Sequence, residues 1–304
     1  GLYNFGNAVL SAAGDTKRPL YYLAFAGVVN VILNLFFVIV CHLGVAGVAL
    51  ASMISQFISA FLILRALLTG KEKYCLRLSE IRFDKRKAVG ILQIGIPSAF
   101  QYSLFAFANL FVQSSVNSFD HVLVEGNSAA ANADPLVYDM MAAFYTACSS
   151  FIAQNFGARK KKRILQTYLI CLFYSFITSL VLGVGIYLAR YPFLYLFTSD
   201  KAVVEAGITR LSIMALSYSA SAFMDASIAA SRGLGKTAVP TFVVVMGSCV
   251  FRIIWIYTIF AYFHTIQSLY ILYVFSWGIT AIAENIYFFH VYRHTLTGKT
   301  ESHL

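Results

Sequence analysis

The sequence predicts an all-α polytopic membrane protein, and three observations support this prediction. The 304-residue chain is 59% hydrophobic and only 12% charged, whereas roughly a quarter of the residues in soluble domains are charged. Uncharged stretches long enough to cross ~30 Å of hydrocarbon recur along the chain. These stretches exceed the length of barrel strands and lack alternating hydrophobicity, so each is expected to be a helix.

Eight spans are expected, preceded by the end of a ninth at residues 1–13. In chain order they cover residues 20–41, 43–64, 88–119, 140–158, 164–189, 203–231, 237–262 and 266–291. The third is too long for one upright helix, so we expect it to tilt, to bend near Pro97 or to extend beyond the bilayer. The last three each contain charged residues.

The distribution of basic residues predicts how the spans are oriented. With eight alternating crossings, one set of loops together with the C-terminus holds 19 of the 23 lysines and arginines. This basic side is expected to be cytoplasmic under the positive-inside rule. The net charge of +10 therefore follows from membrane topology, and no nucleic-acid partner is expected.

One polar corner occurs twice in the sequence, as "GDTKRP" and as "GKTAVP". Aligning Gly14 with Gly235 also aligns Pro19 with Pro240. Glycine permits a sharp reversal, and proline in the first turn of a helix loses no hydrogen bond. Each corner precedes a pair of spans, as expected for two homologous bundles of a transporter. Unrelated tight turns remain an alternative.

The repeat predicts the domain organisation of the chain. With six spans per bundle in the full protein, residues 1–68 hold the end of span 4 and spans 5 and 6 of an N-lobe. Residues 69–87 form a basic cytoplasmic linker, 88–293 a complete C-lobe with spans 7 to 12, and 294–304 a cytoplasmic tail. The first three spans and most of the fourth are then missing from the N-lobe.

Several segments also match a known family in its own order. They are "SAAGDTKRPLYYLAFAGVVNVILNLFFV", "HLGVAGVALASMISQ", "IGIPSAFQYSLFAFANLFVQSSVNSF", "GNSAAANADPLVYDMMAAFYTACSSFIAQNFGARKKKR" and "SRGLGKTAVP". Together they resemble the multidrug and toxic compound extrusion (MATE) family, Firmicute-type bacterial members in particular, over nearly the whole chain. The chain is expected to be an N-terminally truncated member, and it departs from the family at Ser231, where other members carry leucine.

The resemblance implies a secondary antiporter of the bacterial cell membrane, with a cytoplasmic C-terminus, that acts as a monomer. It implies export of small organic, often cationic compounds in exchange for H⁺ or Na⁺, by alternating access between two lobes. No P-loop, metal-ligand spacing or nucleophile–base set is present, so no enzyme activity, cofactor or metal is expected. Two alternatives stay open: a transport-incompetent fragment, and a flippase for lipid-linked oligosaccharide, whose cavity should hold several bases. The spans offer only Arg210 and Arg252.

Ionisable residues inside spans are costly and therefore candidates for function. Asp225 lies roughly 10 Å along its helix from Arg232 and could bind Na⁺ or exchange a proton, or pair with Arg252. Glu284, several turns into the last span, is a second coupling candidate. Asp139 is a third, although its expected place near the outer end of a span also fits a solvated interfacial acid. Arg252 is expected to be the structural charge partner of an acid.

Polar and aromatic residues suggest a substrate cavity. Asn109, Gln113 and Asn117 step by four residues and therefore share one helix face, and Gln101 lies earlier in the same span. Such amides also form hydrogen bonds between membrane helices, which is the structural alternative. The resemblance favours a cavity role, with Phe105 and Tyr145 contacting a flat cation through their ring faces.

Overall fold

The computed structural model describes residues 1–69 and 75–294, and none of these residues lies in a strand. The chain divides into two compact units, of which unit 1 ends at Asp84 and unit 2 begins at Lys85. This division lies within the segment expected to be the linker. The part of that segment at residues 70–74, like the expected tail from residue 295 onward, lies outside the described residues.

Within residues 1–69 and 75–294, eight helical segments are long and apolar enough to cross a membrane, which confirms the predicted multi-pass, all-α fold. They are Lys17–Val40, Gly44–Thr69, Lys85–Val116, His121–Gly157, Lys161–Leu188, Lys201–Gly233, Ala238–Phe263 and Ile266–His294. Many large apolar side chains point outward, for example Phe57 at 69% and Ile286 at 67% exposure. A surface this apolar is suited to lipid.

Unit 1 is a small helical unit. It contains α1 (Leu2–Ala12), α2 (Lys17–Leu35) with the π-helical segment η1 (Phe36–Val40), α3 (Gly44–Thr69) and the short 3₁₀ turn η2 (Leu78–Glu80). Both α1 and α2 pack against α3. The core consists of Tyr3, Leu10, Ile63 and Leu67, and the Tyr3 hydroxyl donates to the carbonyl of Pro19 at 2.9 Å.

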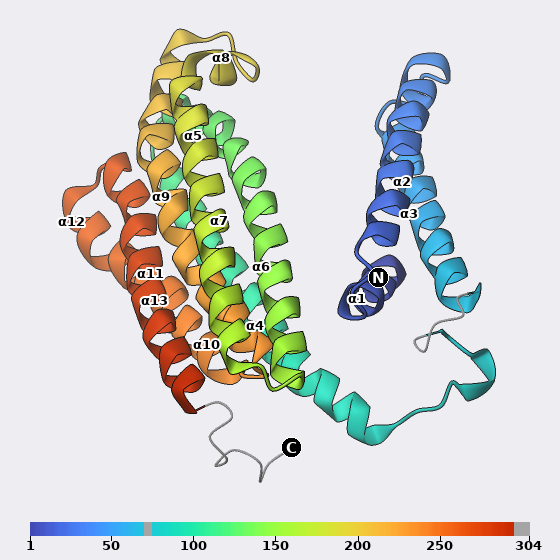
Figure 1. Cartoon of the computed structure of the whole chain (residues 1–304). Coiled ribbons are helices and arrows are strands. Elements are labelled where there is room, and N and C mark those ends of the chain that lie inside the picture. The colour runs from blue at the N-terminus through green and yellow to red at the C-terminus, as the bar shows by residue number, and fades with distance from the viewer. Residues whose placement is uncertain (70–74, 295–304) are drawn as a thin grey trace. The chain divides into compact units, whose positions relative to one another are not determined.

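Unit 2 is a bundle of long helices that run alongside one another (Figure 1). It begins with α4 (Lys85–Val116), α5 (His121–Ala131), α6 (Ala133–Gly157), α7 (Lys161–Leu188), the short α8 (Arg190–Tyr195) and α9 (Lys201–Gly233). It continues with α10 (Ala238–Val244), η3 (Val245–Val250), α11 (Phe251–Trp255), η4 (Ile256–Phe260), α12 (Ala261–Phe263) and α13 (Ile266–His294). Helix α9 is the central element and packs against α5, α6, α7 and α13.

Small residues explain why α9 can have so many neighbours. Gly126 of α5 faces Gly207 of α9, where a Cβ added to Gly207 would lie 3.0 Å from the Gly126 carbonyl oxygen. A Cβ added to Gly183 of α7 would overlap the carbonyl oxygen of Ala215 in α9. Such residues let membrane helices approach backbone to backbone, where dispersion contacts stabilise the bundle.

One long predicted span agrees with the structure, and another differs from it. Helix α4 runs from Lys85 to Val116 with Pro97 inside it, so the third segment is a single helix too long for one upright crossing, as expected. The span expected from residue 140 is much longer, because α5 and α6 form one segment, His121–Gly157, interrupted only at Asn132. The polar residues of this region suggested a loop, yet the helix begins with a true cap, the Asp120 carboxylate accepting from the amide of Leu123.

The two repeated corners have the same backbone geometry. Gly14 and Gly235 both adopt the left-handed conformation, with φ of +91° and +76°. The amide of Asp15 donates to the carbonyl of Leu10 at 2.9 Å, and the equivalent amide, that of Lys236, donates to the carbonyl of Ser231 at 3.0 Å. Both corners are therefore helix ends closed by a left-handed glycine and a bond back to the last turn.

The match continues to the far end of the helical segment that follows each corner. The π-helical segments η1 and η4 lie at corresponding places in the two copies, and each precedes a left-handed histidine, His42 or His264. Prolines also correspond, with Pro19 near the start of α2 and Pro240 within α10. Unrelated turns would not share features at both ends of the helical segment that follows, so the structure favours an internal repeat.

Candidate functional site

A cavity of about 690 Å³ lies in unit 2 and is lined by residues of that unit alone. Its walls come from α4, α5, α6, α9, α10, α11 and α13. This volume is within the usual range for small-molecule sites. Aromatic lining is prominent and comprises Tyr102, Phe105, Tyr138, Tyr145, Tyr270, Tyr273 and Trp277.

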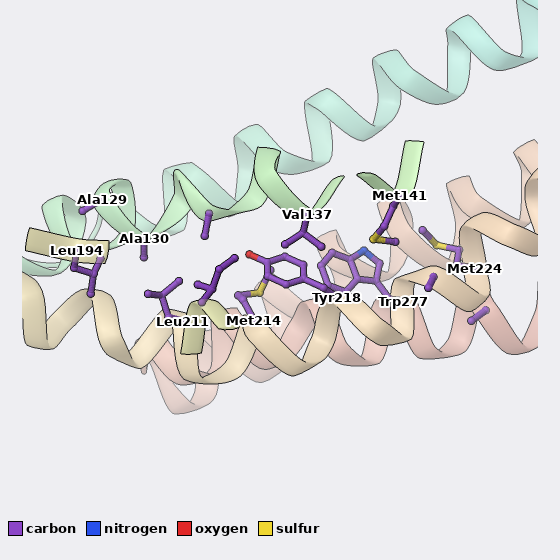
Figure 2. Close-up of a cluster of buried hydrophobic side chains, with 14 of the residues drawn as sticks. Ala129, Ala130, Val137, Met141, Leu194, Leu211, Met214, Tyr218, Met224 and Trp277 are labelled. Carbon is purple, nitrogen blue, oxygen red and sulfur yellow. The ribbon is translucent and has the colours of Figure 1, made fainter. Parts of the chain in front are cut away.

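The aromatic residues that line the cavity are called the aromatic wall below, and most of them belong to the main hydrophobic core of unit 2 or pack against it. Figure 2 shows Tyr218 of α9 and Trp277 of α13 within this buried cluster, with Val137 of α6 close by. The ring of Tyr138 meets both Tyr218 and Trp277 edge-on, at centroid distances of 5.7 and 6.2 Å. Edge-to-face pairs are the favoured arrangement of aromatic rings, so this wall is well ordered by packing.

A buried ion pair holds one end of the cavity together. Arg210 of α9 is only 6% exposed, and its Nη2 donates to the Asp134 carboxylate of α6 at 2.6 Å. The Tyr218 hydroxyl donates to the other oxygen of Asp134 at 2.5 Å, and Arg210 Nη1 donates to the carbonyl of Asn127 at 3.3 Å. These bonds join α5, α6 and α9.

Sequence reasoning missed this network. Asp134 precedes the span that hydropathy marked, and Arg210 was not assigned a role. The available signal was spacing, because Arg210 and Tyr218 are eight residues apart on α9 and therefore share a face. Without a position for α6, nothing in the sequence connected that face to Asp134.

A second arginine of the cavity lies in a helix where a loop was expected. The predicted spans end at residue 231 and resume at residue 237, but Arg232 lies in the last turn of α9 and lines the cavity. Its Nη1 donates to the Tyr145 hydroxyl at 2.7 Å, and its Nη2 donates to Gln101 Oε1 at 2.8 Å. The cavity thus holds three arginines, Arg210, Arg232 and Arg252, where the sequence suggested two.

Arg252 of α11 is fully buried and bonds to neutral groups. Its Nη1 donates to Asn109 Oδ1 at 2.8 Å, and its Nε donates to Ser276 Oγ at 3.2 Å. The guanidinium carbon lies 4.7 Å from the ring centre of Phe105 and 4.6 Å from that of Tyr273. The charge partner predicted for Arg252 is therefore wrong: among the described residues its partners are an amide, a hydroxyl and two rings.

The three predicted coupling acids lie in different environments. Asp225 of α9 is partly buried and lines the cavity. Glu284 of α13 is 0% exposed and outside the cavity lining, and neither of its carboxylate oxygens has a hydrogen-bond partner within the described ranges. Asp139 is exposed in the second turn of α6 and lies midway along the joint helical segment His121–Gly157.

The five predicted cavity residues all line the cavity: Gln101, Phe105, Asn109, Gln113 and Tyr145. Their polar groups are largely engaged within the protein. Gln113 donates to Asn117 at 2.9 Å, and the other two amides accept from arginines. The ring of Tyr145 lies 6.0 Å from the guanidinium of Arg232. The ring faces expected to contact a cationic substrate thus face cations of the protein itself.

Comparison with known proteins identifies relatives. The probable multidrug resistance protein YpnP of Bacillus subtilis is 33% identical over 163 residues, 53% of this chain and 36% of that protein. The probable multidrug resistance protein NorM of Thermotoga maritima is 24% identical over 243 residues, 77% of this chain and 51% of that protein. This chain thus spans about half or less of the length of these curated relatives.

The fold is shared with solved structures. A MOP superfamily transporter from Pyrococcus furiosus superposes with a TM-score of 0.89 at 20% identity, covering 96% of this chain and 66% of that one. The MatE family model matches residues 97–258, which include α9 and most of the cavity lining. Since that match covers more than half of the chain, the protein belongs to the MatE family.

Proposed function

We propose that this chain provides one complete lobe and the end of a second lobe of an ion-coupled antiporter that exports small organic compounds. The observation that supports this most directly is the 690 Å³ cavity, built inside a bundle of membrane-length helices in a MatE chain. Residues 88–293 would form the C-lobe and residues 1–68 the end of the N-lobe, with a cytoplasmic linker and C-terminus. The transporter would act as a monomer in a bacterial cell membrane, without a cofactor.

The coupling residue we favour is Asp225. A carboxylate that lines the cavity can exchange H⁺ or Na⁺ with the solution on whichever side the cavity is open. Substrate binding can affect the same residue, because the coupling ion and the substrate would occupy one cavity. Glu284 is the second candidate, since a carboxyl group that no described residue hydrogen-bonds is costly inside a helix bundle unless it serves a function.

Asp139 is the weakest of the three candidates, because it lies outside the cavity lining and, unlike the buried Glu284, it is exposed. The flippase alternative has gained one argument: a third arginine, Arg232, lines the cavity, as a site for a phosphate-bearing headgroup would require. Transport of a lipid-linked sugar by wild-type protein would favour that alternative over drug export.

A transport assay on protein in which both lobes are present tests the proposal. Vesicles loaded with ethidium or norfloxacin are subjected to an imposed H⁺ gradient or an imposed Na⁺ gradient, and efflux is followed by fluorescence. We expect efflux under one of the two gradients. Asp225→Asn should abolish the gradient-driven part while protein yield is retained, because an amide neither exchanges a proton nor carries the charge that binds Na⁺.

The matched control is Glu125→Gln. In the wild-type protein Glu125 is an exposed carboxylate outside the cavity, and it pairs with His121 at 3.5 Å. Its transport should equal that of wild type. Undiminished efflux by Asp225→Asn would remove that residue from coupling. If Glu284→Gln then abolishes efflux, the coupling residue is the buried Glu284 of α13. The absence of gradient-driven efflux in the wild-type protein would refute the proposal that it is an antiporter.

A further inference from the structure

The charge on Arg252 is not balanced by any acid among the described residues. The guanidinium is 0% exposed and remains protonated in proteins, so a full positive charge sits inside the bundle. A buried charge without a counter-charge is strongly unfavourable unless another group compensates it. Asn109, Ser276 and the two rings supply only dipoles and ring faces.

Two cavity arginines without a paired acid also have unused donors. Nη2 of Arg252 and Nε of Arg232 are buried, and neither has a hydrogen-bond partner in the part of the chain that the structure describes. Buried N–H groups are nearly always paired, so each unused donor calls for an acceptor. Both residues line the same cavity, which makes an occupant of that cavity the natural source of the acceptor.

The remaining charges of the cavity do not cancel this excess. Arg210 is neutralised by Asp134 at 2.6 Å, which leaves Arg232 and Arg252 against Asp225. Asp225 is seven residues before Arg232 on α9, about two helical turns. It therefore balances at most one of the two, and the fully buried Arg252 remains uncompensated.

We propose that the cavity of unit 2 binds an organic anion, whose carboxylate or phosphate accepts from Arg252 and Arg232 while its flat apolar part packs against the aromatic wall. Guanidinium groups suit this role because their fixed fork matches the oxygens of carboxylate and phosphate. The inference deepens the proposed transport function, and it departs from the cationic substrates that the resemblance implies. The anion is either a soluble organic acid or the phosphate headgroup of a lipid.

Binding of two dyes of similar shape and opposite charge tests this proposal on the 304-residue chain itself. Fluorescein is an anion at neutral pH and rhodamine 123 is a cation, and both contain a xanthene ring system. Fluorescence anisotropy is measured with purified chain in micelles of a neutral maltoside detergent. We expect fluorescein to bind at least about tenfold more tightly than rhodamine 123, a difference in binding free energy of about 1.4 kcal/mol.

Substitutions then identify the site. Arg252→Gln should weaken fluorescein binding by about tenfold or more, and Arg252→Lys should fall between, because it keeps the charge but loses the planar fork. Arg190→Gln, on the short helix α8 outside the cavity, is the matched control and should bind as wild type does. If Arg252→Gln does not fold, Arg232→Gln tests the same site, since Arg232 is less buried.

Competition distinguishes the two sources of the anion. Water-soluble dihexanoyl phosphatidylglycerol should displace fluorescein if the site takes a lipid headgroup, with dihexanoyl phosphatidylcholine as the control lipid. If neither lipid competes, the site takes a soluble acid. Equal or tighter binding of rhodamine 123, or fluorescein binding that neither arginine substitution weakens, would overturn the proposal. Because binding needs no ion gradient, these results are independent of whether the transport proposal holds.

Discussion

Replacing Asp134 by asparagine should destabilise unit 2, because among the described residues this carboxylate is the acid that pairs with Arg210. The substitution keeps the size of the side chain and removes its charge. It leaves a guanidinium that is 6% exposed without its counter-ion at 2.6 Å, and it weakens the bond from the Tyr218 hydroxyl. The change therefore perturbs electrostatics with little change in packing volume.

The size of the effect follows from burial. Removing one partner of a buried ion pair costs ~3–5 kcal/mol. Asp134 keeps 22% side-chain exposure and Arg210 retains its bond to the Asn127 carbonyl, so we expect a loss of about 3 kcal/mol, the lower end of that range. Tyr218→Phe removes a single hydrogen bond to a charged group and should cost ~1.5 kcal/mol.

The assay is reversible unfolding of the purified protein in detergent micelles, followed by tryptophan fluorescence. Trp277 is a local reporter, since its ring centre lies 6.4 Å from that of Tyr218 in the cluster of Figure 2. Asp139→Asn is the matched control: it is the same change on the same helix, at an exposed position outside the cavity. Its effect should stay within about 0.5 kcal/mol.

A double-mutant cycle separates the ion pair from general damage. Asp134→Leu and Arg210→Met should each destabilise the unit, whereas the double variant should be closer to wild type than the sum of the two, because no charge is then buried alone. If Asp134→Asn costs no more than Asp139→Asn, or if the two single effects simply add, the pair contributes nothing to stability and the reasoning fails.

Two further predictions concern glycines, and the same unfolding assay measures both. Gly183→Ala should lower the free energy of unfolding by ~1–3 kcal/mol, because the new Cβ would overlap the carbonyl of Ala215. The control Gly185→Ala places its Cβ in open space and should be neutral or slightly stabilising. Gly235→Ala should lower the free energy of unfolding by ~1–2 kcal/mol, because a φ of +76° is strained for any residue that has a Cβ. The control Gly278→Ala in α13 should not destabilise the protein. Equal effects within either pair would contradict the corresponding close approach or backbone geometry.

The sequence alone was sufficient for the class of fold, because hydropathy is a local property of a segment. It predicted eight spans, and the structure contains eight helical segments of the required length and composition within its described ranges. The paired corners were also readable from sequence, since a left-handed glycine followed by a helix-starting proline is a local pattern. Gly14 and Gly235 adopt the same conformation as a result.

Local reasoning was less successful where polar residues lie inside helices. The segment that contains Glu125 and Asp134 was left outside the predicted spans, but it is helical because packing and the carboxylate–arginine pair compensate its polarity. Arg232 was assigned to a loop for the same reason. Its position in the last turn of α9 places it in the cavity wall, where it meets α4 and α6.

The chain's own sequence thus determined that eight segments of its described residues are helices suited to cross a membrane, and which family the protein belongs to. Only the tertiary structure decided which polar and charged groups meet. Arg252 and Asn109 are 143 residues apart in the chain, and Arg210 and Asp134 are 76 apart. Partners at such separations depend on the rotation and spacing of packed helices, which small residues set through backbone contact, and neither quantity is written in the hydropathy of a single span.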